Sequence, residues 1–448
     1  MSVNPFRGHP SRARSLLATA LVAATVVATA AAPATGQDAT DTVTIWGWPT
    51  TIAGFFDTED DTFAKRLKAE TGIDAELVLT EQNELGAKLK AALPAGQGPD
   101  ILLTDFDVMN PYWSFMEPLD ARATAEWGAD WRTKFSGASV DEMALVGDIA
   151  GKPGEALYLP GNVQLLGWLI YDRDAFAAAG VDPASISSFD DLITACGTLK
   201  AADKTAVLMG GHPAGLVDLY QSFVEASAPG KMELAERGQA SFTDADMTAA
   251  FDMIARFYQE CAQEGAIAAT VDAALFGQVF SGQAASSFQF TGTPWFGFVA
   301  DEAGGGADFL ANRAGTFLFP GSKGLAATDA GVGIVAESQH KDAAWEVVKW
   351  IAAGAENQRL ADRSEPMAFL EHPPAGKDTG FDTNVQQPLI DALASGDNKF
   401  RRILCADVYN ALGQVIPGVV QGQIDAAAAG QEVQDAFDRG CQKWVTPS

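Results

Sequence analysis

LKAALPAGQGPDILLTD, residues 89–105, decides the fold class of this chain because it ends one element and begins another of a different kind. The helical segment ELGAKLKAAL (84–93) stops at PAGQGPD (94–100). The apolar run ILLTDF (101–106) that follows is typical of a strand buried on both faces. A buried strand directly after a helix indicates parallel β-structure.

The preceding segment repeats this order. TVTIW (42–46) predicts a first strand, the spacing of Phe63 and Leu67 predicts a helix over 59–70, and IDAELVL (73–79) predicts a second strand. Strand, helix, strand, helix, strand is the order of a parallel α/β sheet.

A second set of alternating elements begins near residue 156. ALYLPGNVQLLGWLIYD (156–172) is extended and apolar, and a helix over 187–202 is capped by Ser188 or Ser187. Strands are expected again at 206–210, 315–324 and 331–338, and helices at 242–265, 341–357 and over most of 385–444. A chain of 448 residues is too long for one core, and no single linker divides it. We therefore expect lobes joined by several crossings.

Charge excludes one class of partner. The chain carries 58 Asp and Glu against 30 Lys and Arg, a formal net charge of −28 spread along its length. A surface of this sign repels phosphate backbones, so nucleic acid is not an expected partner.

The N-terminus has the composition of a secretory signal. Residues 1–36 contain Arg7, Arg12 and Arg14 and no acidic residue, followed by LLATALVAATVVATAAA (16–32) and small residues suited to cleavage. The alternative is an uncleaved anchor, but the run is short and weakly apolar. No cysteine near the cleavage region could accept a lipid, so we expect a free, monomeric periplasmic protein.

Export affects how the four cysteines are interpreted. Cys196 and Cys261 lie on the apolar stripes of expected helices, and Cys405 and Cys441 fall near the C-terminus. In an oxidising compartment they favour two disulfides, and we prefer the pairs 196–261 and 405–441 among three connectivities because each joins helices of one lobe. Four buried free thiols remain the alternative.

Enzyme motifs are absent from the sequence. It has no G-x-S-x-G, phosphate loop, dinucleotide fingerprint or H-E-x-x-H, and His212, His340 and His372 are isolated. Asp190 and Asp191 could be taken for a glycosidase pair, but helix capping explains them. We expect no catalytic residue, no metal site and no cofactor.

Aromatic, amide and acidic residues instead gather where expected strands end, in WGWP (46–49), TDFDVMNPYW (104–113), PGNVQ (160–164) and QFTGTPWFG (289–297). Ligands of open α/β sheets bind at the carboxyl ends of strands. There an indole can stack on a sugar ring while carboxylates and amides bind its hydroxyls. We expect Trp48 to face such a site and Trp46 to pack in the core.

The order of several segments resembles the extracellular solute-binding proteins of carbohydrate ABC importers, the family of maltose-binding protein. The matching segments are TVTIWGW (42–48), FAKRLKAETGIDAEL (63–77), residues 89–105 and 156–199, LFGQVFSGQAASSFQFTGTPWFGF (275–298), FLFPGSKG (317–324), GVGIVAESQHKDAAWEVVKWIA (331–352) and VVQGQIDAAAAGQEVQDAFDRG (419–440). Each segment alone is weak, and their shared order is specific. Asp172 departs from the family, which more often has asparagine there.

The resemblance implies a two-lobed, type II-like periplasmic binding protein with mixed sheets flanked by helices, a hinge and a helical C-terminal tail. After the signal peptide, one lobe would take residues 38–155 and 315–360, and the other residues 156–314 and 361–448. A sugar or oligosaccharide would bind in the cleft, and the closed form would meet the importer's membrane permease.

The family's motifs also assign site residues. The ligand-binding residues so implied are Trp48, Thr50, Asp105, Asp107, Asn162, Gln164, Trp295, Glu365 and Tyr409. The resemblance leaves the ligand open. A binding protein for a polyol, a polyamine or another non-sugar solute is the main alternative, and an exported glycosidase is a remote one.

Overall fold

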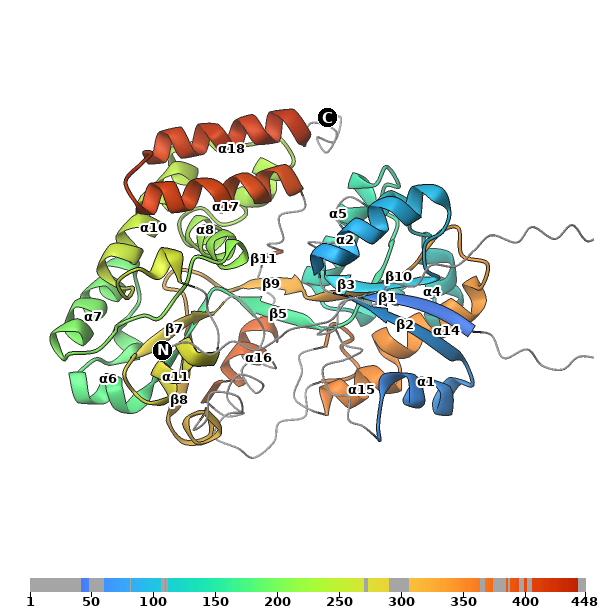
Figure 1. Ribbon diagram of the computed structural model, residues 1–448, viewed down its shortest axis with the longest axis horizontal. Helices are drawn as coiled ribbons and strands as arrows, with labels where there is room; N and C mark the ends of the chain where they lie inside the picture. The colour runs from blue at the N-terminus through green and yellow to red at the C-terminus, as the bar shows by residue number, and fades with distance from the viewer. Residues whose placement is uncertain are drawn as a thin grey trace, which may run out of the picture. The chain divides into compact units, whose positions relative to one another are not determined.

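The computed structural model describes residues 42–47, 60–80, 82–105, 109, 112–269, 273–289, 306–362, 367–373, 384–385, 387–394, 399–400 and 405–441 (Figure 1). The expected signal peptide lies outside these residues. Residues 40–448 form one compact unit.

The first sheet contains the parallel strands that the opening segment predicts. Its order is β2 (Asp74–Leu79), β1 (Thr42–Gly47), β3 (Ile101–Asp105), β10 (Ala330–Ile334) and β4 (Leu159–Pro160). β1 is parallel to both β2 and β3, whereas β10 is antiparallel to β3 and β4. The sheet is therefore mixed, with its antiparallel strand supplied from far along the chain.

Helices cover both faces of this sheet: α1 (Phe63–Thr71), α2 (Gln82–Ala92), α4 (Asp120–Trp127), α5 (Gly137–Ile149), α14 (Lys341–Ala353) and α15 (Ala355–Ala361). In Figure 1, α2 lies on one face, and α1 and α14 lie on the other. α1 begins later than the expected residue 59 because Thr62 caps it, accepting a hydrogen bond from the Lys65 amide. It ends at Gly72 in the left-handed conformation, and Phe63 and Leu67 are fully buried.

Two further sheets have three strands each. One has the order β11 (Lys399–Phe400), β9 (Leu325–Thr328), β5 (Val163–Leu166), and the other β7 (Ser286–Gln289), β6 (Trp168–Asp172), β8 (Ala314–Leu318). The expected strand at 206–210 is instead a pair of isolated bridges, Val207 with Ala262 and Leu208 with Ser287.

The other helices in the described part of the chain are α6 (Arg173–Ala179), α7 (Phe189–Ala201), α8 (Pro213–Ser227), α9 (Lys231–Glu236), α10 (Ala245–Glu260), α11 (Ala273–Phe280), α13 (Gly306–Asp308), α16 (Gln387–Ala394), α17 (Ala406–Val420) and α18 (Ala426–Gly440). Short 3-10 turns occupy Leu93–Ala95, Trp113–Phe115, Trp131–Lys134, Pro183–Ser185 and Ala266–Ala268, and a π turn occupies Phe309–Arg313.

Helix caps explain most of the boundaries. Ser188 caps α7 in a capping box with Asp191, as the sequence predicts. Asp172, the departure from the family pattern, caps α6 by accepting from the Asp174 and Ala175 amides. α10 ends at Glu260, before the expected residue 265, and the Cys261 carbonyl beyond it accepts a hydrogen bond from the Val207 amide.

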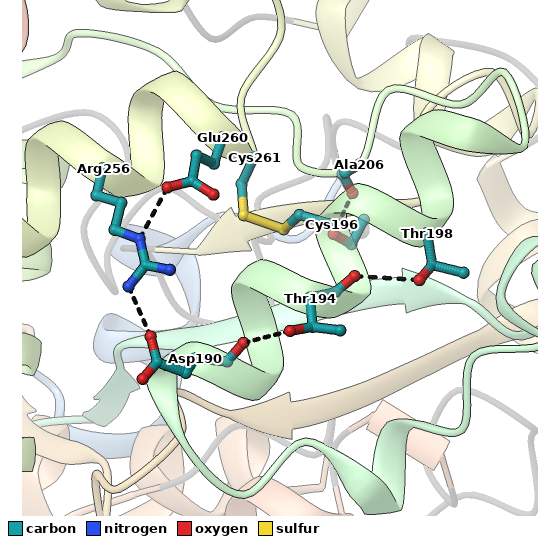
Figure 2. Close-up of a disulfide and its surroundings, with 9 residues drawn as sticks. Asp190, Thr194, Cys196, Thr198, Ala206, Arg256, Glu260 and Cys261 are labelled. Atoms are coloured by element: carbon teal, nitrogen blue, oxygen red, sulfur yellow. Dashed lines mark hydrogen bonds and ion pairs between the residues drawn. A yellow bond between two sulfur atoms is a disulfide. The ribbon is translucent and has the colours of Figure 1, made fainter.

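Both predicted disulfides are present. Cys196 on α7 is bonded to Cys261 at the end of α10, and Cys405 at the start of α17 is bonded to Cys441 at the end of α18. Figure 2 shows the first pair, and beside it Arg256 bridges Asp190 and Glu260. Asp190 is thus one end of a surface ion pair.

The buried side chains fall into separate clusters. The first core takes residues 43–163 and 326–369, and the second takes residues 169–288, Phe319 and residues 405–441. A third, smaller cluster contains Trp168, Phe309 and their neighbours. Along the chain, the buried residues of the first core end at Val163, resume at Ala326 and end again at Phe369.

Two of the tryptophans have defined packing roles. Trp46 is half-buried and packs against the first core, and Trp113 is 2% exposed with its ring 5.2 Å from that of Tyr158. Trp113 is therefore a core residue despite its position after a strand end.

Candidate functional site

One edge of the first sheet collects the ends of strands that are distant in sequence. Gly47 at the end of β1 pairs with Leu79 at the end of β2 and with Leu103 in β3. Asp105 at the end of β3 pairs with Ala330 at the start of β10. Since β10 runs in the opposite direction, its first residue lies at the carboxyl ends of the parallel strands. We call this edge the carboxyl edge.

The candidate residues follow from this edge. Trp48 and Thr50 come directly after Gly47, and Asp107 comes after Asp105, but all three lie outside the described residues. The backbone of Asp105 ends β3, and the backbone of Gln164 pairs with Ala327 in β9. The strand register thus brings the ends of β1 and β3 to the carboxyl edge, whereas Gln164 lies in the separate β11–β9–β5 sheet.

Gly47 is required where β1 ends. A Cβ atom at this position would lie 2.4 Å from the Leu103 carbonyl oxygen, which is closer than side chains tolerate. The Gly47 carbonyl accepts a hydrogen bond from the Thr80 amide. Gly47 therefore lets β1 lie tightly against β3 at the last residue of β1.

Asn162 lies at the carboxyl edge, but its side chain is 6% exposed and bonded to protein groups. Its Nδ2 donates to Asp329 Oδ2 over 3.2 Å, and its Oδ1 accepts from the Ala330 amide over 3.3 Å. These bonds join the segment between β4 and β5 to the segment between β9 and β10. Local sequence does not reveal these bonds, because Asp329 and Ala330 are far from Asn162 in the chain.

The segment that follows Glu365 is fixed to the same edge. Glu365 itself lies outside the described residues, but Met367 forms a β-bridge with Asn162. The Ala368 amide donates to the Gly161 carbonyl over 2.9 Å, and the Ala368 carbonyl accepts from the Ser136 amide over 2.8 Å. The chain two residues after Glu365 is therefore next to another candidate residue.

The other candidates belong to the second part of the molecule. β7 ends at Gln289, which pairs with Trp168 at the start of β6, and Trp295 beyond it lies outside the described residues. Leu318 at the end of β8 also pairs with Trp168, so β7 and β8 end at the same sheet edge. Tyr409 on α17 is half-buried and packs against the second core.

His372 is expected to make stability depend on pH. Burial lowers the pKa of this imidazole below its ordinary value, although Glu371 and Asp362 oppose the shift. Because the unfolded chain binds a proton at higher pH than the folded one, stability should be complete above about pH 6.5 and fall as the pH drops below it.

Urea unfolding at about pH 7.5 and about pH 5.5 checks this prediction. The wild type should lose more stability between the two pH values than a His372→Asn variant, which keeps a donor for Asn357 Oδ1 in place of the ring Nδ1, 2.9 Å away. Equal losses would show that His372 is not the group responsible.

Two pockets lined by described residues lie away from the carboxyl edge. One of about 670 Å³ surrounds Ser338 and His340 before α14, and one of about 380 Å³ lies beside Tyr258 and Gln263. The two cationic side chains lining the first, Lys341 and Arg122, both bind Glu117. Neither pocket brings together the candidate residues.

Two further statements apply only to the described part of the chain. Within it, no three His, Cys, Asp or Glu side chains gather closely enough to hold a metal ion. None of the helices there has both the length and the hydropathy that a membrane span needs.

Comparison with known proteins identifies the family. Residues 56–358 match the family model described as bacterial extracellular solute-binding protein. The chain belongs to this family. This solute-binding protein is therefore a binding protein and not an enzyme, as the missing catalytic motifs predict. No curated protein sequence matches it.

Solved structures show the same fold at low identity. The GacH receptor of Streptomyces glaucescens, studied unliganded and with acarbose, is 17% identical with a TM-score of 0.67, and the match covers 90% of this chain and 98% of the receptor. A maltose-bound protein of T. maritima has 16% identity, a TM-score of 0.66 and coverages of 89% and 99%. A Thermotoga lettingae solute-binding protein with α-D-tagatose has 16% identity, a TM-score of 0.67 and the same coverages. The solute-binding protein thus has the mixed α/β periplasmic-binding-protein fold that the sequence predicts.

Proposed function

We propose that this solute-binding protein captures a sugar or oligosaccharide in a cleft between two lobes and delivers it to the permease of an ABC importer, as a periplasmic monomer. The main support is the carboxyl edge of the first sheet. There the segments bearing Trp48, Asp107, Asn162 and Glu365 start from neighbouring backbone positions. Indoles and carboxylates in one place suit a sugar, whose ring stacks while its hydroxyls are bound.

The two lobes would correspond to the two large cores. One lobe would comprise residues 42–163 and 326–369, and the other would comprise residues 164–325 and the C-terminal helices. Solved relatives of the same fold carry tagatose, maltose or acarbose according to their descriptions. Closure on the ligand would follow from a higher affinity of the closed form.

Thermal-shift measurements with purified protein test the ligand class. The panel contains monosaccharides, disaccharides, oligosaccharides, polyols and polyamines. We expect one class of sugar to raise the free energy of unfolding by about 2.7 kcal/mol when it is present at a hundred times its Kd. Stabilisation by polyamines or polyols alone would replace the sugar proposal with the corresponding alternative. An oligosaccharide recovered shortened would indicate a glycosidase.

Trp295→Ala is expected to abolish most of the sugar-induced stabilisation while leaving the melting temperature of the free protein nearly unchanged. The reason is that an indole stacked on a sugar ring contributes to the complex and little to the unliganded fold.

Trp113→Ala is the matched control. Because Trp113 is 2% exposed in the first core, its loss should lower the melting temperature of the free protein and leave the sugar-induced shift in place. If Trp295→Ala behaves like Trp113→Ala, Trp295 is a core residue and not a ligand contact.

A further inference from the structure

Two extended segments of the chain pass between the cores side by side. Residues 159–172 and 314–334 pair antiparallel three times, as β4 with β10, β5 with β9 and β6 with β8. In the middle pair, Leu166, Leu325 and Ala327 form a small apolar cluster separate from the large cores. The β5–β9 pair is therefore the passage from one core to the other.

Helix α8 of the second core holds one end of this passage. Gly167 has a φ of 74°, and a Cβ atom there would lie 2.3 Å from Ser222 Oγ on α8. A Cβ on Gly321, in the loop facing it, would lie 3.3 Å from the Ala226 Cβ on the same helix. The backbone rests so closely on α8 that this end of the passage moves with the second core.

Polar side chains hold the other end. The Thr328 amide at the end of β9 donates to Glu142 Oε2 over 3.1 Å, and the Thr328 hydroxyl donates to Ser139 Oγ over 3.3 Å. Ser139 and Glu142 are on α5 of the first core. Next along the chain, Asp329 binds the Asn162 side chain, and its amide donates to the Asn162 carbonyl over 3.1 Å.

The burial of these groups is unusual. Glu142 and Thr328 are 0% exposed, and Ser139 is 1% exposed. Removing a carboxylate from water is costly, and an apolar residue would fill the same space more cheaply. An apolar residue, however, would not fix the position of the strand. A carboxylate that accepts from a strand amide does, because the hydrogen bond is strong only when the N–H points at the carboxylate oxygen.

We propose that Ser139, Glu142, Asn162, Thr328 and Asp329 form a crossing clamp. It fixes the first-core end of the β5–β9 passage and so sets the balance between the open and closed forms. In this proposal they are positioning residues, and Asn162, which the family resemblance assigns to the ligand site, acts through its bonds to Asp329 and Ala330. The proposal rests on the proposed function, since only a protein that closes on a solute has such a balance.

Hydrogen exchange of the unliganded protein tests the clamp. In Glu142→Ala, amides at 325–332 and 160–166 should exchange about tenfold faster relative to amides of α14, because the Thr328 amide loses its acceptor. Glu142→Gln keeps a carbonyl acceptor of the same size and should restore most of the protection. Asn162→Ala should accelerate the same segments.

Glu356→Ala is the matched control. Glu356 is also a buried carboxylate of the first core, 1% exposed, but it lies on α15 away from the passage. The Glu356→Ala variant should have a lower free energy of unfolding. The ratio of hydrogen-exchange rates between the β5–β9 passage and α14 should stay unchanged. If Glu142→Ala cannot be purified folded, Thr328→Val removes only the hydroxyl and should accelerate exchange in the same segments to a smaller degree.

Distance distributions between spin labels provide a readout that a purely stabilising role would not change. Labels at Glu346→Cys on α14 and Gln431→Cys on α18 report on the two cores, and both side chains are exposed. Glu142→Ala should broaden or shift the distribution, and Glu356→Ala should not.

Unchanged distances together with an unchanged exchange ratio would overturn the proposal. Neither experiment uses a ligand, so failure of the sugar proposal in the thermal-shift panel would not affect them.

Discussion

Replacing both Cys196 and Cys261 by alanine is expected to lower the free energy of unfolding by about 4 kcal/mol. The bond joins residues 65 positions apart, so its loss returns a large amount of conformational freedom to the unfolded chain. Both cysteines are buried in the second core, 1% and 0% exposed. The Cys196–Cys261 disulfide therefore holds α7 against α10 within the packed interior (Figure 2).

Urea unfolding of the oxidised wild type, the reduced wild type and the alanine variant measures the effect. Reduced wild type should fall below the variant, since reduction also breaks the Cys405–Cys441 bond, which the variant keeps. The Cys405–Cys441 bond closes a shorter loop, with a sequence separation of 36. A Cys405→Ala, Cys441→Ala variant should therefore lose about 0.5 kcal/mol less free energy of unfolding than the Cys196→Ala, Cys261→Ala variant. Equal midpoints for the oxidised and reduced wild type would contradict the prediction.

Glu356→Ala is expected to cost about 3 kcal/mol, the second large effect. The carboxylate of Glu356 is 1% exposed and accepts from Arg66 Nε over 3.1 Å and from Arg66 Nη2 over 3.0 Å. It also accepts from Arg359 Nε over 2.8 Å. Without it, two guanidinium groups, on α1 and α15, would share a largely buried space with no charge between them.

Two variants define this effect. Asp61 also pairs with Arg66, but its side chain is 51% exposed, so Asp61→Ala should cost less than about 1 kcal/mol. Glu356→Gln keeps the shape and removes the charge, and should fall between the two. A Glu356→Ala variant as stable as Asp61→Ala would show that water replaces the carboxylate without loss.

Local features of this protein could be predicted from sequence because their physics is local. Ser188 and Asp191 cap α7 through bonds that span only three residues, and the ILLTD run forms a parallel strand as expected. The cysteine pairing was also predicted, because the apolar helix positions of Cys196 and Cys261 indicated a shared interior. The prediction of a strand at 206–210 was wrong. Val207 and Leu208 instead form isolated β-bridges with Ala262 and Ser287, which belong to two different segments.

The candidate site could be predicted only in part. Parallel strand order predicts that β1 and β3 end at the same edge of the sheet. The register of the two strands shows that they do. The bonds of Asn162 to Asp329 and Ala330 could not be foreseen, because the residues are more than 160 positions apart. Nothing local distinguishes an asparagine that binds a sugar from one that binds a neighbouring strand.

The sequence by itself determined the alternation of strands and helices, the Ser188 cap and the family, since these depend on residue type, short spacing and segment order. It favoured the observed disulfide pairs among three connectivities. The tertiary structure decided which distant segments touch. It placed β10 against β3 and joined Glu142 to the end of β9. Such contacts depend on how whole elements pack, and a buried carboxylate like Glu142 shows its partner only after the chain has folded around it.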